Sequence, residues 1–206
     1  MTRAPVDQDM KDLEKYIKFL KERLFFEPDS GVLHYNLGVA YLRKGLREEA
    51  LSEFKQAVQC DPRLAQAYVN MAGIYLQQGD FERCIEYNLK ALEVDENLPM
   101  AYNNLGFVYL RTNQYEKAVE ACKKAVQLMP QLFQAHHNLG LAYFHLDKLD
   151  AAKEAFLKSL EAKPDFAPAY FHLSLVCDRM GLEDEARNYR QKAISLGYPV
   201  DSEQDL

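Results

Sequence analysis

Glycine and proline are scarce in this chain, at nine and eight of 206 residues, which is too few for a Gly/Pro-rich low-complexity protein. An excess of basic residues is missing too. Lys and Arg number 25 against 31 Asp and Glu, and the formal net charge is −6. Such a chain has no general positive field to attract nucleic acid or anionic lipid. We therefore expect no nucleic-acid partner.

A long uncharged apolar segment is also missing. The longest stretch without Lys, Arg, Asp or Glu covers residues 125–146, but it contains Pro130, Asn138 and three histidines. These groups make a poor membrane span. The charged residues at the start are not followed by the apolar core of a signal peptide. The sequence therefore predicts a cytoplasmic protein without membrane insertion.

Cysteine is sparse and lacks the spacing of a metal or redox motif. The four residues lie far apart without a Cys-x-x-Cys pair, and we expect buried reduced thiols at Cys60, Cys84, Cys122 and Cys177. The common nucleotide-binding, metalloprotease and hydrolase signatures are absent. His137 and His172 are expected to approach each other, but metal binding there is disfavoured. We expect no catalytic residue, no metal site and no cofactor.

A repeat of constant length organises most of the chain. Prolines stand at positions 28, 62, 130 and 164, so the middle interval is twice as long as the other two, and Glu96 occupies the place of the missing proline. A fixed period of roughly 20–50 residues is typical of stacked repeats. With the frame set at Gly31, the copies are 31–64, 65–98, 99–132, 133–166 and 167–200.

The columns of this frame predict two helices in each copy. The fifteenth column holds residues that tolerate a left-handed turn after a helix, namely Gly45, Gly79, Asn113, Asp147 and Gly181. Three columns later an acid follows in every copy, where it suits the first turn of a new helix. We expect the first helix from about the second to the fourteenth column, and the second from about the seventeenth to the thirtieth.

Other columns repeat in the same order: an aromatic ring or histidine, Leu or Met, a small residue and Tyr, then Ala, Phe, Ala and Pro. This pattern resembles the tetratricopeptide repeat (TPR) family over residues 31–200. The resemblance implies an all-α, right-handed TPR superhelix, an α-solenoid of five helix-turn-helix repeats with an extra N-terminal helix. Asn88, Cys122 and Arg190 depart from the pattern, because they replace the aromatic seen at Phe54 and Phe156. The fifth copy is degenerate.

The two ends lie outside the five copies. Residues 1–30 contain an amphipathic helix with apolar residues at Met10, Leu13, Ile17, Leu20 and Leu24. We interpret it as a half-repeat that caps the first copy. The alternative is that its apolar stripe, with Phe19, Phe25 and Phe26, docks on another subunit. Residues 201–206 are expected to form a short acidic disordered tail.

In TPR proteins, the second, fifth, sixth, ninth, twelfth and thirteenth columns line the concave face. Here the sixth column holds Asn36, Asn70, Asn104 and Asn138, followed by His172. A side-chain amide both donates and accepts hydrogen bonds, so it suits the main chain of an extended peptide. The ladder resembles that of the TPR superhelix in O-linked N-acetylglucosamine transferases, whose groove asparagines hold peptide backbone. The alternative is that these asparagines only bond neighbouring helices.

Two further sets complete the predicted site. The aromatic residues expected to be exposed in the groove are Tyr35, Phe107 and Phe171. The thirteenth column carries Arg43, Arg111 and Arg179, a sparse cationic line that selects acidic ligands or forms a solvated edge. The sequence predicts a non-catalytic scaffold or adaptor that binds an extended segment of a protein partner. The alternative is a self-assembling structural scaffold, a homo-oligomer in which an end helix of one subunit fills the groove of another.

Overall fold

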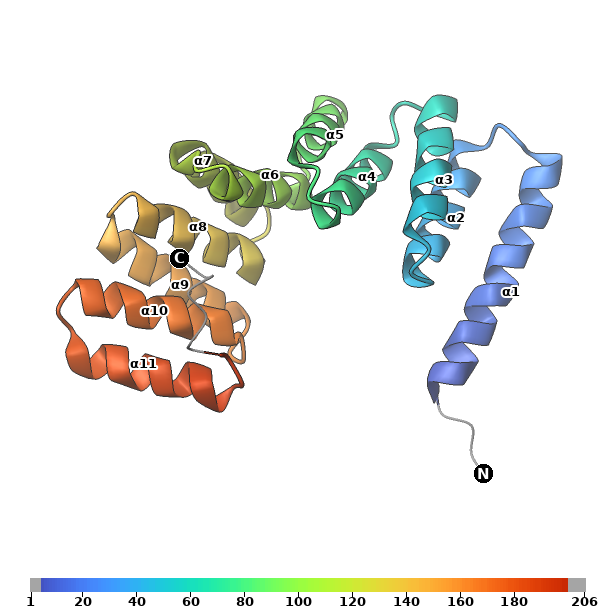
Figure 1. Ribbon diagram of the computed structural model, residues 1–206. Coiled ribbons are helices and arrows are strands. Elements are labelled where there is room, and N and C mark those ends of the chain that lie inside the picture. Colours follow the sequence, from blue (N-terminus) through green and yellow to red (C-terminus); the bar gives the residue numbers. More distant parts are fainter. Residues whose placement is uncertain (1–4, 200–206) are drawn as a thin grey trace. The chain divides into compact units, whose positions relative to one another are not determined.

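The computed structural model describes residues 5–199, with side chains from Asp9 onward. All regular structure in this range is helical (Figure 1). The helices are α1 (Pro5–Phe26), α2 (Gly31–Arg43), α3 (Arg47–Cys60), α4 (Ala65–Gln77), α5 (Phe81–Val94), α6 (Pro99–Arg111), α7 (Tyr115–Leu128), α8 (Phe133–His145), α9 (Leu149–Ala162), α10 (Ala167–Arg179) and α11 (Glu183–Ser195). The all-α prediction is confirmed. The expected tail, residues 201–206, lies outside the described residues. Among the helices described here, none has the length and apolar character needed to cross a membrane.

After α1, the helices form pairs whose first members begin one repeat length apart. Each first helix begins at the first column of its copy, one residue earlier than predicted, and each second helix begins at the seventeenth. Between them the fifteenth-column residue has a positive φ of 57–80° in every copy. The amide that follows donates to the carbonyl five residues earlier, at 2.8–2.9 Å. This bond satisfies a terminal carbonyl of the first helix and turns the chain back.

The chain divides into two compact units. Unit 1 ends at Glu96 and holds α1–α5, and unit 2 begins at Asn97 and holds α6–α11. In unit 1, α1 packs against α2, and α3 packs against α4. In unit 2, α8 contacts both α6 and α10, while α7 packs on α8 and α9 packs on α10. The first helices of unit 2 are therefore neighbours.

Small residues let the two helices of a pair approach closely. Phe156 on α9 is fully buried, and a Cβ added at Gly140 on α8 would lie 2.7 Å from its ring. Gly38 on α2 has the same relation to Phe54 on α3, again at 2.7 Å. The eighth-column glycine thus makes room for the aromatic residue of the second helix.

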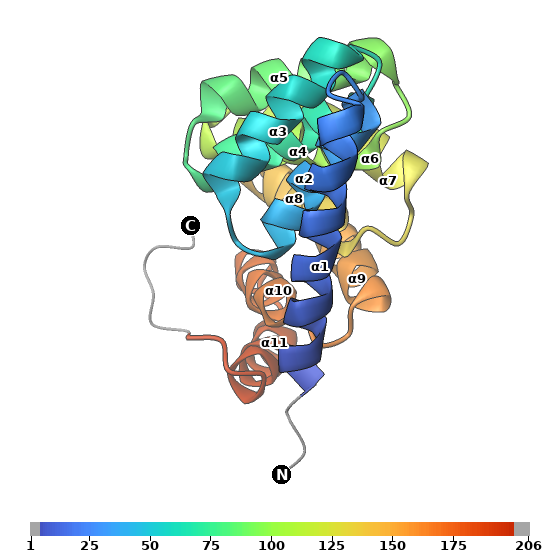
Figure 2. The same ribbon diagram turned by 90° about the vertical axis from the view of Figure 1, so that its right-hand side faces the viewer.

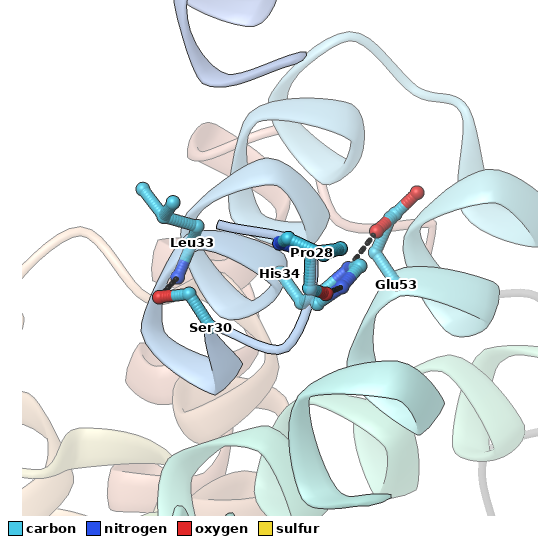
Figure 3. A network of polar contacts seen from close by, with 5 residues as sticks. All are labelled: Pro28, Ser30, Leu33, His34 and Glu53. Atoms are coloured by element: carbon cyan, nitrogen blue, oxygen red, sulfur yellow. Dashed lines mark hydrogen bonds and ion pairs between the residues drawn. The ribbon is translucent and has the colours of Figure 1, made fainter. Parts of the chain in front are cut away.

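A polar network fixes the turn between α1 and α2 (Figure 3). His34 contacts the Pro28 carbonyl through Nε2 at 2.9 Å and the Glu53 carboxylate through Nδ1 at 2.7 Å. The Leu33 amide donates to Ser30 Oγ at 3.4 Å and so caps α2. The same bond to a proline carbonyl recurs at His136 Nε2, at 2.8 Å from Pro130 O. In these two copies, the fourth-column histidine therefore anchors the first helix to the turn before it.

Candidate functional site

The four sixth-column asparagines do not share one environment. Asn36 on α2 and Asn70 on α4 are half-buried in unit 1. In unit 2, Asn104 on α6 is 8% exposed and Asn138 on α8 is 6% exposed. The amides of unit 1 are therefore more accessible to a ligand than those of unit 2.

Unit 2 pairs the fifth column of one copy with the sixth column of the next. Asn138 Nδ2 on α8 donates to Asn103 Oδ1 on α6 at 3.1 Å. His137 Nε2 on α8 lies 3.1 Å from His172 Nδ1 on α10. Because both pairs join first helices of successive copies, these polar columns hold neighbouring helices together. Asn138 therefore follows the alternative given in the sequence analysis: it bonds a neighbouring helix.

The two paired histidines lie inside an aromatic cluster. The His137 ring is 5.4 Å from that of Phe156 and 5.1 Å from that of Phe166, and the His172 ring stacks on Phe156 at 5.6 Å. His172 Nδ1 also lies 2.7 Å from the Pro168 carbonyl. A carbonyl only accepts, so Nδ1 of His172 donates there and His137 Nε2 is left as an acceptor.

This arrangement favours neutral His137. Burial, and then the positive charge of a protonated His172, lower the pKa of His137 well below its usual range. The described residues contain no group of three or more His, Cys, Asp or Glu side chains arranged to hold a metal ion. The predicted approach of His137 and His172 is confirmed, and its observed role is to bond α8 to α10.

The accessible side chains of unit 2 belong mainly to other columns. In the ninth column Phe107 is 37% exposed, and Leu141 and Leu175 are half-buried. The thirteenth-column side chains are all exposed in unit 2, at Arg111, His145 and Arg179. An apolar line and a cationic line thus occupy the same three helices, α6, α8 and α10. Because the columns are four residues apart, each pair shares one helix face.

The cationic line contains two ordered members. Arg179 pairs with Asp147 at 3.1 Å, and its guanidinium lies 4.9 Å from the centre of the Phe144 ring. His145 stacks on the Tyr115 ring at 4.5 Å. Burial and the nearby Arg179 lower the pKa of His145. The lowered pKa favours neutral His145, so the arginines carry the positive charge of this line at neutral pH.

The prediction that Phe171 is exposed is wrong. Phe171 on α10 is only 7% exposed, because the Tyr198 ring from the segment after α11 stacks on it at 4.9 Å. The prediction that all four thiols are buried is wrong for Cys60, which is exposed at the end of α3. Cys84, Cys122 and Cys177 are buried and reduced.

Unit 1 presents two hollows beside predicted residues. Tyr35, half-buried, lines an opening of about 480 Å³ with Leu64, Gln66 and Val94. Arg43, exposed at the end of α2, lines a second hollow of about 480 Å³ with residues of α1. Both lie within unit 1, and both combine apolar walls with charged edges.

One residue that pairs with a predicted site residue was not predicted from the sequence. Asn103, in the fifth column, is the partner of Asn138 and is 8% exposed. The available signal was the double asparagine at 103–104, together with the histidine that follows in the same column at His137. A fifth-column residue bonds the sixth-column residue of the next copy, one position beyond the repeat period, so the period alone does not pair them.

Comparison with known proteins agrees with this architecture. A family model described as tetratricopeptide repeat matches residues 63–129 and 97–165. Two further models of the same description match residues 32–64 and residues 167–196. A sequence search of curated proteins finds no match for this chain.

Several solved structures share the fold. MamA from Desulfovibrio magneticus RS-1, residues 41 to the end, is 27% identical with a TM-score of 0.72, covering 84% of this chain and 97% of that one. PilF from Pseudomonas aeruginosa is 26% identical with a TM-score of 0.73, covering 82% and 77%. YrrB, described as a TPR protein with an unusual peptide-binding site, is 20% identical with a TM-score of 0.73, covering 86% and 92%.

Proposed function

This chain belongs to the tetratricopeptide repeat family, and we propose that it is a non-catalytic scaffold that holds an extended segment of a partner protein on the first-helix faces of its units. The observation that carries the proposal is the pair of accessible lines on unit 2. Apolar side chains of the partner lie over the ninth column, beginning at Phe107. Acidic side chains lie toward Arg111 and Arg179, which are exposed.

The spacing of the helices fits an extended ligand. Packed helices lie roughly 10 Å apart, and an extended chain rises roughly 3.3 Å per residue. Each first helix therefore meets about every third residue of the ligand, and three helices need a segment of about nine residues. Alternating apolar and acidic residues would match the two lines.

In unit 1, the accessible asparagine amides bind the main chain of the ligand, which is the role that the sequence predicted for all four sixth-column asparagines. Asn36 and Asn70 are half-buried and contact the ligand main chain, while Tyr35 offers an aromatic wall to one side chain. Asn138 is left out, because its amide already donates to Asn103. With a net charge of −6 we expect no nucleic acid as partner, and we place the scaffold in the cytoplasm without a cofactor.

The test for unit 2 uses two fluorescein-labelled probes of about nine residues. The acidic probe alternates Leu, Asp and Gly, and its neutral counterpart has Asn in place of Asp. Binding is followed by fluorescence polarisation at low salt and at about 0.5 M salt. The variant is Arg111→Gln with Arg179→Gln. The matched control, Lys124→Gln with Lys192→Gln, removes two exposed charges from the second helices α7 and α11.

We expect the Arg111/Arg179 variant to weaken acidic-probe binding by about tenfold at low salt, since each exposed ion pair contributes up to about 1 kcal/mol. High salt reduces the difference, and the neutral probe changes little. Phe107→Ala weakens both probes. Equal losses in the variant and the lysine control would show that net charge, and not the thirteenth column, attracts the ligand.

The test for unit 1 replaces Asn36 and Asn70 with Ala. Two lost hydrogen-bonding groups contribute about 1 kcal/mol each, so binding to unit 1 should weaken by about tenfold or more. The loss should be the same for both probes, because the main chain is recognised. Unchanged affinity in a folded variant would remove the asparagines from the mechanism.

A further inference from the structure

One side of α1 carries an apolar stripe that the rest of unit 1 leaves exposed. Tyr16, Phe19 and Phe26 are 44%, 51% and 77% exposed, and their spacing of three and seven places them on one side of the helix. Ile17 and Leu20 of α1 are buried instead. In Figure 2, α1 lies at the front of unit 1, and no other helix of the unit lies in front of it.

This side does not suit the first helix of another repeat. Residues 13–26 of α1 lie one repeat length before α3 and so hold the register of a second helix. In true second helices, two of the columns that face the paired first helix, the twentieth and the twenty-seventh, hold small residues. The Ala118 carbonyl, for example, lies 3.6 Å from where a Cβ on Gly106 would be, and Ser159 Oγ donates to the Phe133 carbonyl at 2.9 Å.

In α1 the equivalents of these two small columns are Tyr16 and Arg23. The bulk of a tyrosine and an arginine keeps a first helix from approaching as closely as it does in the five pairs. The stripe therefore needs a partner that packs at a larger distance and offers aromatic and charged groups in return.

A second α1 offers such a surface. Asp12 and Arg23 lie on the same side of the helix as the stripe, one toward each end. They are equally far from the midpoint between Ile17 and Lys18, and so are Tyr16 and Phe19. If two copies of α1 pair antiparallel about that midpoint, Asp12 meets Arg23 of the other copy at both ends, and Tyr16 meets Phe19. In this register the two ends of the stripe are complementary in charge, as a twofold interface requires.

The surface also contains a hollow that can accept the Arg23 side chain of the other copy. Asp9, Asp12 and Tyr16 line the hollow of about 480 Å³ between α1 and Arg43 of α2. Asp9 and Asp12 place two carboxylates beside the Arg43 guanidinium, and the tyrosine ring adds a face on which a second guanidinium can stack. Within α1, Asp12 pairs with Lys15 at 3.1 Å, and Arg23 pairs with Glu27. Exposed pairs of this kind contribute little and exchange readily.

We propose that two copies of this chain associate through antiparallel α1 helices, with Arg23 of each copy seated in the acidic hollow beside Tyr16 of the other. This interface goes beyond the proposed peptide-binding function and uses none of its residues on unit 2. Neither copy uses the apolar and cationic lines of its unit 2 in this interface, so each copy of the dimer keeps its own set of these lines.

The test is charge reversal followed by mixing, read by sedimentation of the full chain from about 1 µM to about 1 mM. Asp12→Arg and Arg23→Asp each place like charges together, and we expect each to weaken association by at least about tenfold. The variant carrying both changes restores the opposite pairs and the association. A mixture of the two single variants also associates, because each copy then supplies the charge that the other lacks.

Lys11→Asp is the matched control, since Lys11 is exposed on the charged side of α1, away from the stripe, and the change alters net charge as Arg23→Asp does. It should leave association unchanged. A wild-type chain that stays monomeric throughout would overturn the proposal. So would association that survives both single reversals, or that neither the double variant nor the mixture restores. If Arg111→Gln with Arg179→Gln abolishes association while the α1 variants do not, an end segment of one copy occupies the unit 2 face of another, and the α1 interface is wrong.

Discussion

Replacing Gly140 with Ala measures how tightly α8 packs on α9. The added methyl group would lie 2.7, 2.7 and 2.9 Å from three atoms of the Phe156 ring, which is fully buried. The rings of His137 and His172 lie 5.4 and 5.6 Å from that of Phe156, so the phenyl group has little room to move away. Overpacking of this kind costs about 1–3 kcal/mol. The better helix propensity of Ala returns about 0.5–1 kcal/mol.

We therefore expect Gly140→Ala to lower the free energy of unfolding by up to about 2.5 kcal/mol. Gly73→Ala is the control, because we expect it to change the free energy of unfolding in the opposite direction. Gly73 also lies inside a helix, α4, but nothing stands within 4 Å of an added Cβ. Only the propensity gain remains, so this variant should be more stable by about 0.5–1 kcal/mol. Urea unfolding followed by far-UV circular dichroism measures both changes.

A second background separates ring contact from any other effect. Phe156→Leu removes ring atoms that the new methyl group would meet, so Gly140→Ala should cost much less in the Phe156→Leu chain than in the wild type. Stabilisation by Gly140→Ala in the wild type, comparable to that of Gly73→Ala, would refute the reasoning. It would mean that α8 and α9 separate at little cost.

Three other outcomes follow from the structure. The pKa of His137 is lowered in the folded chain, so the unfolded chain binds a proton at this residue first as the pH falls below about 6.5, and the free energy of unfolding falls. In His137→Gln, the melting temperature should therefore decline less between about pH 6.5 and 5 than it does in the wild type. Burial raises the pKa of Cys84 to about 11 and that of Cys122 to about 12, so a thiol reagent should modify exposed Cys60 quickly and these two only on unfolding, whereas equal rates for all would contradict the burial. A chain ending at residue 166 should stay folded, since the cut falls between helix pairs, while one ending at residue 114 leaves α6 without α7 and should scatter light as it aggregates.

The sequence by itself determined the helices and the turns between them. These features depend on contacts within one copy. The fifteenth column fixes the turn, because only Gly, Asn and Asp adopt its positive φ readily, as Gly45 and Asn113 do. The small eighth column and the large residue of the second helix meet inside the same pair, as Gly140 and Phe156 show. The residue types of one copy are therefore enough to predict its two helices and the turn between them.

The tertiary structure decided which predicted site residues are accessible. Accessibility depends on the neighbouring copy, which the column of a residue does not specify. Asn36 and Asn138 share a column, yet only Asn138 is buried and bonded to Asn103 of the preceding copy. Phe171 is covered by Tyr198, which follows α11. The side chains of α1 show the same dependence, because Leu20 is buried where α2 packs and Phe19, one residue earlier, is left exposed. Burial is set by what packs against a surface, and that is decided only when the copies come together.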